Sequence, residues 1–418
     1  MFSKTNNSLT ALFAPIISMC ILTIGNGFFT TLTTLQLNAF HSPDWLIGLI
    51  SSVYFAGLII ASFRAQRFII RVGHIRAYAA FASLLAVSSL IQGLTPNPII
   101  WLISRYICGY CVAGLLIVIE SWCLEGSSST NKGRIIAFYL FSYYLALALG
   151  QLLLKFHYSL SLTPFCIIAG TASLSIIPVC ITRFEAPKLA PPSTFSPWIY
   201  TKKIPLGVFG SLVSGLVLGG IYTLLPLAFV DLHFSTNEVA YLMGATILGG
   251  TLFQLPIGKI SDLVDRRLIL ITICAICSLV SFILIFLQIK FWSILLLIFL
   301  LGGSAFVIYP LSINHATDYT KKSDTIAVLS TLSLFYGIGS TFGPIILANL
   351  MHWFGTTMIF SFNSIVCLSL ILFAIWRLTI RKKVSEKEKA NFVAATQEIV
   401  IGAEQSLNEE LNRPPKKI

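Results

Sequence analysis

The chain has 418 residues, of which 56% are hydrophobic and only 11% are charged, and its formal net charge at pH 7 is +12. A soluble domain carries about 25% charged residues, so this composition excludes an ordinary globular protein, a disordered chain and a disulfide-stapled scaffold. Only a lipid bilayer accepts so much apolar surface, and the composition therefore predicts a polytopic membrane protein.

A membrane-spanning helix needs about 20 mostly apolar residues. Twelve stretches of the chain meet this requirement, and they are residues 11–35, 45–64, 76–94, 98–120, 134–155, 163–181, 205–230, 238–259, 268–288, 291–314, 325–350 and 357–377. The first stretch is too long for a cleaved signal peptide, and no Ala-x-Ala site follows it. The sequence predicts an all-α membrane protein with twelve transmembrane helices.

The basic residues predict the orientation of these helices. If the amino terminus is cytoplasmic, all but three of the 28 lysines and arginines lie in cytoplasmic segments. The exceptions are Lys155 and Lys290, in outer loops, and Arg105, within the fourth span. By the positive-inside rule, we expect both termini to be cytoplasmic. We also expect the protein to lie in the cell inner or plasma membrane. The positive charge then forms a rim that faces anionic membrane lipids, and no nucleic acid is expected as a partner.

A proline-rich basic segment divides the chain into two similar parts. We expect a six-helix half at residues 1–181, a cytoplasmic linker at 182–204, a second half at 205–377 and a cytoplasmic tail at 378–418. A shift of 192 residues superimposes the start of the first span on the start of the seventh. The sequence thus predicts two pseudo-symmetric halves.

Two ionisable residues of the fourth span are candidates for transport chemistry, because a charge within a span is costly unless it is paired or faces water. Arg105 is either a cation that faces a cavity or a structural arginine bonded to backbone carbonyls. Glu120 follows about 22 Å further along the helix, so the two cannot pair but can face one cavity from its two ends. Alternatively, Glu120 pairs with Lys132 or Arg134 at the interface.

With these spans, halves and loops, the chain resembles the major facilitator superfamily over nearly its whole length. The family's loop signature, Gly-x-x-x-Asp-Arg/Lys-x-Gly-x-Arg/Lys-Arg/Lys, is matched in the second half at Gly258, Asp262 and Arg267. In the first half it is matched at Arg71, Gly73 and Arg76, with Ile70 in place of the aspartate. The resemblance implies that these residues form an inner gate, in which Asp262 latches against the start of the fifth span.

The resemblance also implies a central cavity and a route for protons. Arg105 and Gly109 match the family's fourth-span signature, which is implicated in proton transfer in proton-coupled relatives. Since spans one, four, seven and ten line the family's cavity, the preferred cavity residues are Asn26, Arg105, Tyr222 and Tyr309. Further polar candidates within spans are Gln151, Gln254 and Tyr336. Each of these can instead serve as a hydrogen-bonding residue between helices.

The sequence thus predicts a secondary transporter that moves a small organic solute by alternating access, coupled to protons through Glu120 and Arg105. A proton-driven exporter of drugs or metabolites is the nearest alternative. The residues Arg71–Arg76 and Glu120–Trp122 also resemble the YcaD-type branch of the superfamily.

Other function classes have little support in the sequence. A membrane-embedded lipid-modifying enzyme would need a cluster of ionisable residues at one interface, where His315 and Asp318 form the only pair. A passive channel or a sensor is a third alternative. No nucleotide-binding loop is present, and the two CxxC pairs lie within apolar spans. We therefore expect no metal or other cofactor, no enzyme activity, and a monomer that contacts its solute, protons and lipid.

Overall fold

The computed structural model describes residues 7–125, 132–156, 161–181, 197–286, 290–320 and 324–380. Within these ranges every regular element is helical. The helices are α1 (Asn7–Ala39), α2 (Asp44–Val72), α3 (His74–Leu94), α4 (Pro98–Glu125), α5 (Lys132–Gln151), η1 (Leu152–Lys155), α6 (Thr163–Leu174), α7 (Ile176–Ile181), α8 (Pro197–Lys203), α9 (Pro205–Asp231), α10 (Thr236–Leu263), α11 (Arg266–Phe286), α12 (Phe291–Asp318), α13 (Thr325–Phe354) and α14 (Met358–Ile380).

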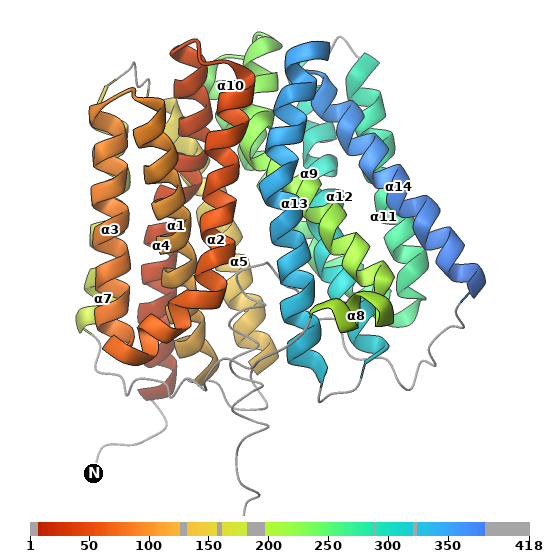
Figure 1. The fold of residues 1–418 in the computed structure, drawn as a ribbon, viewed down its shortest axis with the longest axis horizontal. Helices are drawn as coiled ribbons and strands as arrows, with labels where there is room; N and C mark the ends of the chain where they lie inside the picture. The colour runs from red at the N-terminus through yellow and green to blue at the C-terminus, as the bar shows by residue number, and fades with distance from the viewer. Residues whose placement is uncertain are drawn as a thin grey trace, which may run out of the picture.

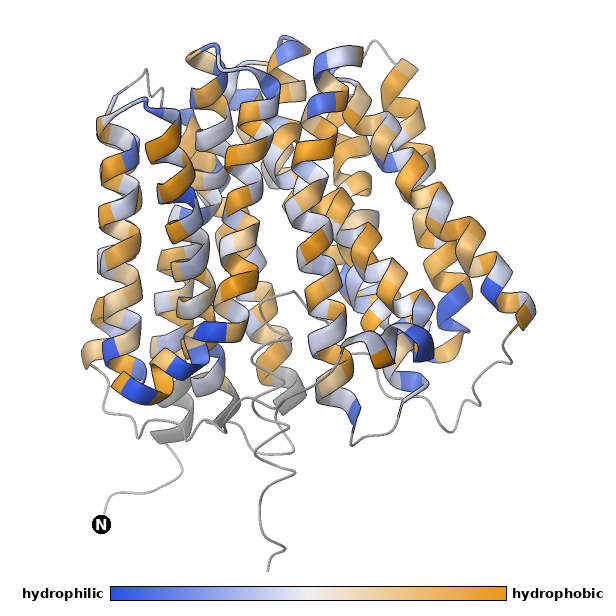
Figure 2. Cartoon of the chain, in the orientation of Figure 1, coloured by the Kyte–Doolittle hydropathy of each residue, from blue (hydrophilic) through white to orange (hydrophobic). Residues whose placement is uncertain are grey.

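Twelve spans of these described residues are long and apolar enough to cross a membrane, which confirms the predicted helical membrane fold. Figure 2 shows an apolar band across the middle of the molecule, with the hydrophilic residues gathered mainly toward its two ends. The sixth span consists of two helices, α6 and α7, which meet at Ser175. Most of the predicted linker and nearly all of the predicted tail lie outside the described residues, so the assigned domain boundaries stay a prediction.

The second span is longer than the sequence analysis expected. Arg71, placed there in a loop after residue 64, lies in the last turn of α2, which continues to Val72. The helix continues because Ala65 and Ile69 still pack inward, while the arginines stay exposed on the other face. It ends at Gly73, whose φ of 88° suits a residue without a side chain, and whose N–H donates to Ile69 O at 2.8 Å.

Two six-helix groups repeat the same packing. In the first, α1 packs on α5, α2 on α4 and α3 on α6, and in the second α9 packs on α13, α10 on α12 and α11 on α14 (Figure 1). Glycines permit the closest approach in both groups. A Cβ on Gly109 would overlap the backbone oxygen of Tyr54, and one on Gly302 would overlap that of Thr246. Small residues at such crossings are a general feature of packing between membrane helices.

The turns after the first helix of each group also match. His41 and His233 have φ values of 52° and 64°, and they are the described non-glycine residues with positive φ. The N–H of His41 donates to Asn38 O and that of the next residue to Leu37 O, while the turn at His233 repeats both bonds. Each turn is a Schellman helix end, and the two are 192 residues apart, which is the offset found in the sequence.

The two groups are in contact mainly at one end of the molecule. We call the end at which α1 and α9 begin the amino-terminal side, and the opposite end the distal side. Toward the distal side α2 and α13 converge, where Gly48 fits against Pro344 and Ala348, and toward the amino-terminal side they diverge (Figure 1). The hydroxyl of Thr34 on α1 also donates to the backbone oxygen of Thr223 on α9 at 2.7 Å. These contacts close the distal side.

Candidate functional site

A cavity lies between the two groups near the middle of the spans. Its volume is about 60 Å³. Both groups contribute to its wall, which is formed by Asn26, Thr30, Tyr54, Phe55, Leu58, Tyr143, Tyr144, Leu147, Leu218, Tyr222, Phe306, Tyr309 and Tyr336. Six of these residues are tyrosines and two are phenylalanines, and none of the described lining residues is charged.

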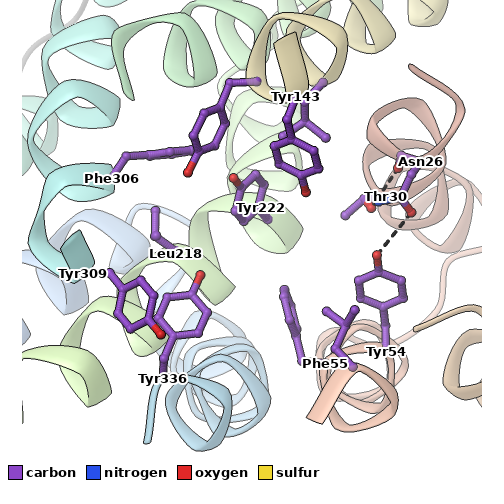
Figure 3. A pocket seen from close by; sticks show the side chains of 13 residues that line it. Asn26, Thr30, Tyr54, Phe55, Tyr143, Leu218, Tyr222, Phe306, Tyr309 and Tyr336 are labelled. Carbon is purple, nitrogen blue, oxygen red and sulfur yellow. Dashed lines mark hydrogen bonds between the residues drawn. The ribbon is translucent and has the colours of Figure 1, made fainter. Parts of the chain in front are cut away.

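One wall of the cavity carries an ordered polar cluster. The hydroxyl of Tyr54 on α2 donates to Asn26 Oδ1 on α1 at 3.2 Å. One turn further along α1, the hydroxyl of Thr30 donates to the backbone oxygen of Asn26 at 3.1 Å. Figure 3 shows these three side chains together on one side of the cavity, with the dashed bonds meeting at Asn26. Hydrogen bonds of this kind fix the position of the Tyr54 ring at the cavity surface.

The facing wall is aromatic. The rings of Tyr309 and Tyr336 have centroids 4.6 Å apart, and Tyr222 contacts Phe306 edge-on at 5.4 Å. Phe306 also contacts Tyr144 of the first group at 5.6 Å, so aromatic packing joins the groups at mid-membrane. Stacked and edge-on rings present flat apolar faces, while tyrosine hydroxyls supply hydrogen-bonding groups (Figure 3).

Arg105 lies one layer behind this cavity. Its guanidinium is over the Tyr54 ring at 4.4 Å and over the Phe29 ring at 4.8 Å, and the residue is 1% exposed. Its Nε and Nη1 have no hydrogen-bond partner among the described residues. Arg105 is therefore absent from the cavity wall in this conformation, and the Tyr54 ring separates the two.

Two further predicted cavity residues also lie away from the wall. Gln151 accepts a hydrogen bond from Thr31 at 2.8 Å and donates to the backbone oxygen of Gly27 at 2.9 Å, which holds α5 against α1. Gln254 on α10 is buried, with 4% of its surface exposed. The structure thus brings Asn26, Tyr222, Tyr309 and Tyr336 together at the cavity, and Arg105, Gln151 and Gln254 are not part of its wall.

Glu120 lies toward the amino-terminal side, on the same helix as Arg105. It is 3% exposed and accepts a hydrogen bond from the Tyr139 hydroxyl of α5 at 3.3 Å. Nearby, the rings of His74 and Trp122 pack at 5.8 Å. A buried carboxyl group within a span has the chemistry of a proton carrier, and the coupling role of Glu120 stays a prediction.

The predicted gate residues of the second group lie in or beside a charged cluster on its amino-terminal side, whereas Arg71 and Gly73 lie at the end of α2 in the first group. Asp262, at the end of α10, pairs with Arg266 at 3.1 Å, and Arg266 also lies 3.3 Å from the buried carboxylate of Asp318 on α12. Arg267 pairs with Asp265 at 2.7 Å. Gly258 is buried one turn before Asp262, and the latch of Asp262 against the start of the fifth span involves side chains outside the described residues.

Burial by itself raises the pKa of Asp265, which lies between α10 and α11. Hydrogen bonds from the Arg267 side chain and backbone N–H, together with the charges of Arg267 and His315, outweigh this effect, so the pKa of Asp265 lies below its ordinary value. Asp265 is therefore ionised and bonded to Arg267 at neutral pH.

Sequence reasoning missed most of the aromatic wall. Tyr54, Phe55, Tyr143, Tyr144 and Phe306 were not among the predicted residues. The prediction preferred polar side chains on spans one, four, seven and ten, so it passed over the tyrosines of α2 and α5 and the phenylalanines. A usable signal was present, since a tyrosine hydroxyl in hydrocarbon needs a polar partner or water.

Known proteins match this chain in both sequence and structure. The sequence profile of the Major Facilitator Superfamily matches residues 207–414. An uncharacterized MFS-type transporter of Yersinia pestis is 27% identical over 344 residues, which cover 82% of this chain and 89% of the relative. The uncharacterized MFS-type transporter YcaD of Escherichia fergusonii is 28% identical with the same coverage.

Solved structures show the same fold. A mutant form of the nucleoside transporter NupG matches with a TM-score of 0.74 at 12% identity, over 89% of this chain and all of NupG. A second NupG structure gives a TM-score of 0.71 at 13% identity. These named relatives are transporters and not enzymes. No group of three or more potential metal ligands occurs in the part of the chain that the structure describes.

Proposed function

This chain belongs to the major facilitator superfamily and is a secondary transporter of the membrane rather than an enzyme, and on that premise we propose that it carries a small, flat organic solute in the aromatic cavity by alternating access. The observation that carries the proposal is the cavity itself. Side chains from both groups meet around it, and the hydrogen bond from Thr34 to Thr223 joins the groups on its distal side. Access from alternating sides requires such a site, at mid-membrane between two halves.

The lining chemistry favours an uncharged or anionic solute with a planar part. Eight aromatic rings offer stacking surfaces, and Asn26, Thr30 and the tyrosine hydroxyls offer hydrogen bonds. The guanidinium of Arg105, 4.4 Å from the Tyr54 ring, adds a positive potential behind the wall. In a low-dielectric interior this potential disfavours a cationic solute. Asn26, Tyr222, Tyr309 and Tyr336 are the proposed contacts.

Proton coupling through Glu120 and Arg105 is the second part of the proposal. Glu120 is the titrating group, and Arg105 sets the charge balance at the cavity. Both side chains are buried on α4. Protonation of Glu120 or binding of a solute therefore changes the free-energy cost of keeping the Arg105 guanidinium away from water. We also propose that the amino-terminal side is cytoplasmic in an inner or plasma membrane, that the cluster around Asp262 gates it, and that the protein works as a monomer.

The substrate is found first by a thermal-shift screen of the purified protein against aromatic and heterocyclic acids, neutral compounds and quaternary amines. We expect the stabilising compounds to be acids or neutral molecules. Replacement of Tyr222 or Tyr336 by phenylalanine should weaken their effect, because it removes one hydroxyl and leaves the ring. A screen in which only cations stabilise the protein would contradict the proposed site.

Transport is then measured in proteoliposomes with the compound from the screen. We expect counterflow, meaning that unlabelled compound inside the vesicles accelerates uptake of labelled compound, since a carrier exchanges and a pore does not. Uptake should also depend on an imposed pH gradient. Uptake without counterflow would indicate a channel, and equal uptake with the gradient present or collapsed would remove the proton from the mechanism.

A further inference from the structure

A second hollow lies between the two groups on the distal side. It is walled by α5 and η1 of the first group and by α10 and the start of α12 of the second, and its volume is about 600 Å³. Its walls are almost wholly apolar, and they include Leu149 at 46% and Trp292 at 77% exposure. We call it the distal groove. Because its walls are exposed and apolar, it faces the hydrocarbon of the membrane.

The rim of the distal groove carries both lysines that the sequence assigns to the outer loops. Lys155 Nζ lies 2.5 Å from the Tyr241 hydroxyl and 4.0 Å from the centroid of its ring. The Tyr241 ring lies 6.5 Å from that of Phe291, and both rings line the groove. Lys290, exposed, directly precedes Phe291 at the start of α12. Two cations therefore flank one end of an apolar groove.

We propose that the distal groove binds one anionic phospholipid, with an acyl chain between α5 and α10 and its phosphate at Lys155 and Lys290. The apolar walls select a hydrocarbon chain over a polar solute. The lysines select an anionic headgroup, because basic residues at the membrane surface attract anionic lipid. Tyr241 and Trp292 lie at the rim, the level at which such aromatic residues meet lipid headgroups.

The bound lipid connects the two groups on the side that is closed. Its chain contacts α5 of the first group and α10 and α12 of the second, so any movement that separates the groups on the distal side changes the shape of its site. A ligand shifts an equilibrium toward the conformation that it binds better. The lipid therefore favours the conformation with the distal side closed, independently of which solute the central cavity carries.

The site can be tested by mass spectrometry of the intact protein released from nanodiscs that contain phosphatidylglycerol and phosphatidylcholine in equal amounts. The wild type should retain one phosphatidylglycerol in preference to phosphatidylcholine. The double variant Lys155→Gln and Lys290→Gln should lose this preference, by about fivefold for each lysine removed. Lys202→Gln is the matched control, because Lys202 is exposed on the amino-terminal side.

A second variant tests the apolar part of the site. Gly244 lines the groove, and a Cβ there would meet only Ala148 O, at 3.8 Å, so Gly244→Leu adds a side chain to the groove whose Cβ does not overlap the backbone. It should abolish retention of both lipids. Gly170→Leu is its control, because a Cβ there meets nothing within 4 Å and Gly170 lies away from the groove.

Equal retention of the two lipids by the wild type would overturn the proposal, as would unchanged retention in the lysine double variant. Retention by Gly244→Leu at the wild-type level would place the lipid elsewhere and overturn the groove as its site. None of these results bears on solute transport, so the proposed function and the lipid site can fail separately.

Discussion

Replacement of Arg105 by methionine is expected to stabilise the protein and to stop transport. Arg105 is 1% exposed, and its guanidinium makes cation–π contacts with two aromatic rings. Its Nε and Nη1 have no hydrogen-bond partner among the described residues. Methionine has a similar length and is apolar and flexible, so it can fill the same space. If Arg105 had a structural role, its replacement would lower the stability of the fold. If its role is in transport, the fold should tolerate the replacement while transport is lost.

The magnitude follows from two opposing effects. Loss of two desolvated cation–π contacts costs about 4 kcal/mol. Removal of a buried charge recovers several kcal/mol, and removal of two N–H groups without partners recovers about 1–3 kcal/mol each. We expect a net stabilisation of about 2 kcal/mol, within the range of about 1–4 kcal/mol found when buried ionic groups are replaced by apolar ones. For a chain of this length this corresponds to a rise in Tm of about 2 °C.

Arg266 provides the matched control. It is also a buried arginine, at 2% exposure, but it pairs with Asp262 at 3.1 Å and lies 3.3 Å from Asp318. Arg266→Met leaves the carboxylate of Asp318, whose side chain is 4% exposed, buried without this cation. Breaking a buried pair costs about 3–5 kcal/mol, so this variant should melt below the wild type. The two substitutions are chemically identical and have opposite expected signs.

Thermal unfolding in detergent and counterflow in proteoliposomes are the two measurements. The reasoning is refuted if Arg105→Met melts lower than the wild type by as much as Arg266→Met does. That result would mean that Arg105 is held by contacts that stabilise the fold, and that its position behind Tyr54 is structural. Full transport activity in a stabilised Arg105→Met variant would refute the functional half alone.

Three further outcomes follow from the same structure. Gly109→Ala places a methyl group on the backbone oxygen of Tyr54, so it should lower stability by about 1–3 kcal/mol and weaken solute-induced thermal shifts, whereas Gly170→Ala should change neither. Asp265 has a lowered pKa in the folded protein, so its stabilising effect is present above its unfolded pKa of about 3.9 and is lost as the pH falls through the folded value. The Asp265→Asn variant should therefore melt lower than the wild type at pH 7, and its Tm should fall less on acidification. Tyr309→Phe should raise the Kd of the solute identified by thermal shift with little change in Tm, since the ring contact with Tyr336 at 4.6 Å is kept.

The helical architecture could be predicted from the sequence because each span must satisfy its own backbone hydrogen bonds in hydrocarbon. That requirement acts on every span separately, so local composition predicts each one. The error at Arg71 shows the limit of the method. An arginine marks the membrane boundary in a hydropathy scan, but it does not end a helix, and α2 continues to the glycine that does.

The cavity was harder to predict because its wall depends on how helices from the two groups rotate against each other. Tyr222 and Tyr309 could be chosen from their spans, but Tyr143 and Phe306 line the cavity only because α5 and α12 present those faces to it. Arg105 was correctly identified as an unusual charge within a span. Whether it faces the cavity or lies behind one aromatic ring is a difference of a few ångströms, which no residue pattern encodes.

The position of Arg105 behind Tyr54 bears directly on how solute binding could be linked to charge. The ring that covers the guanidinium is the ring that donates to Asn26 in the cavity wall, with 3.2 Å between the two polar atoms. A solute that accepts or replaces this hydrogen bond must compete for Tyr54, and displacement of Tyr54 exposes the guanidinium. An anionic solute would gain from that exposure and a cationic one would lose. The Tyr54→Phe substitution separates these steps, because it removes the bond to Asn26 and keeps the ring over Arg105. We expect it to strengthen binding of an anionic solute, since the ring moves aside more easily, and weaker binding in this variant would show that the hydroxyl itself contacts the solute.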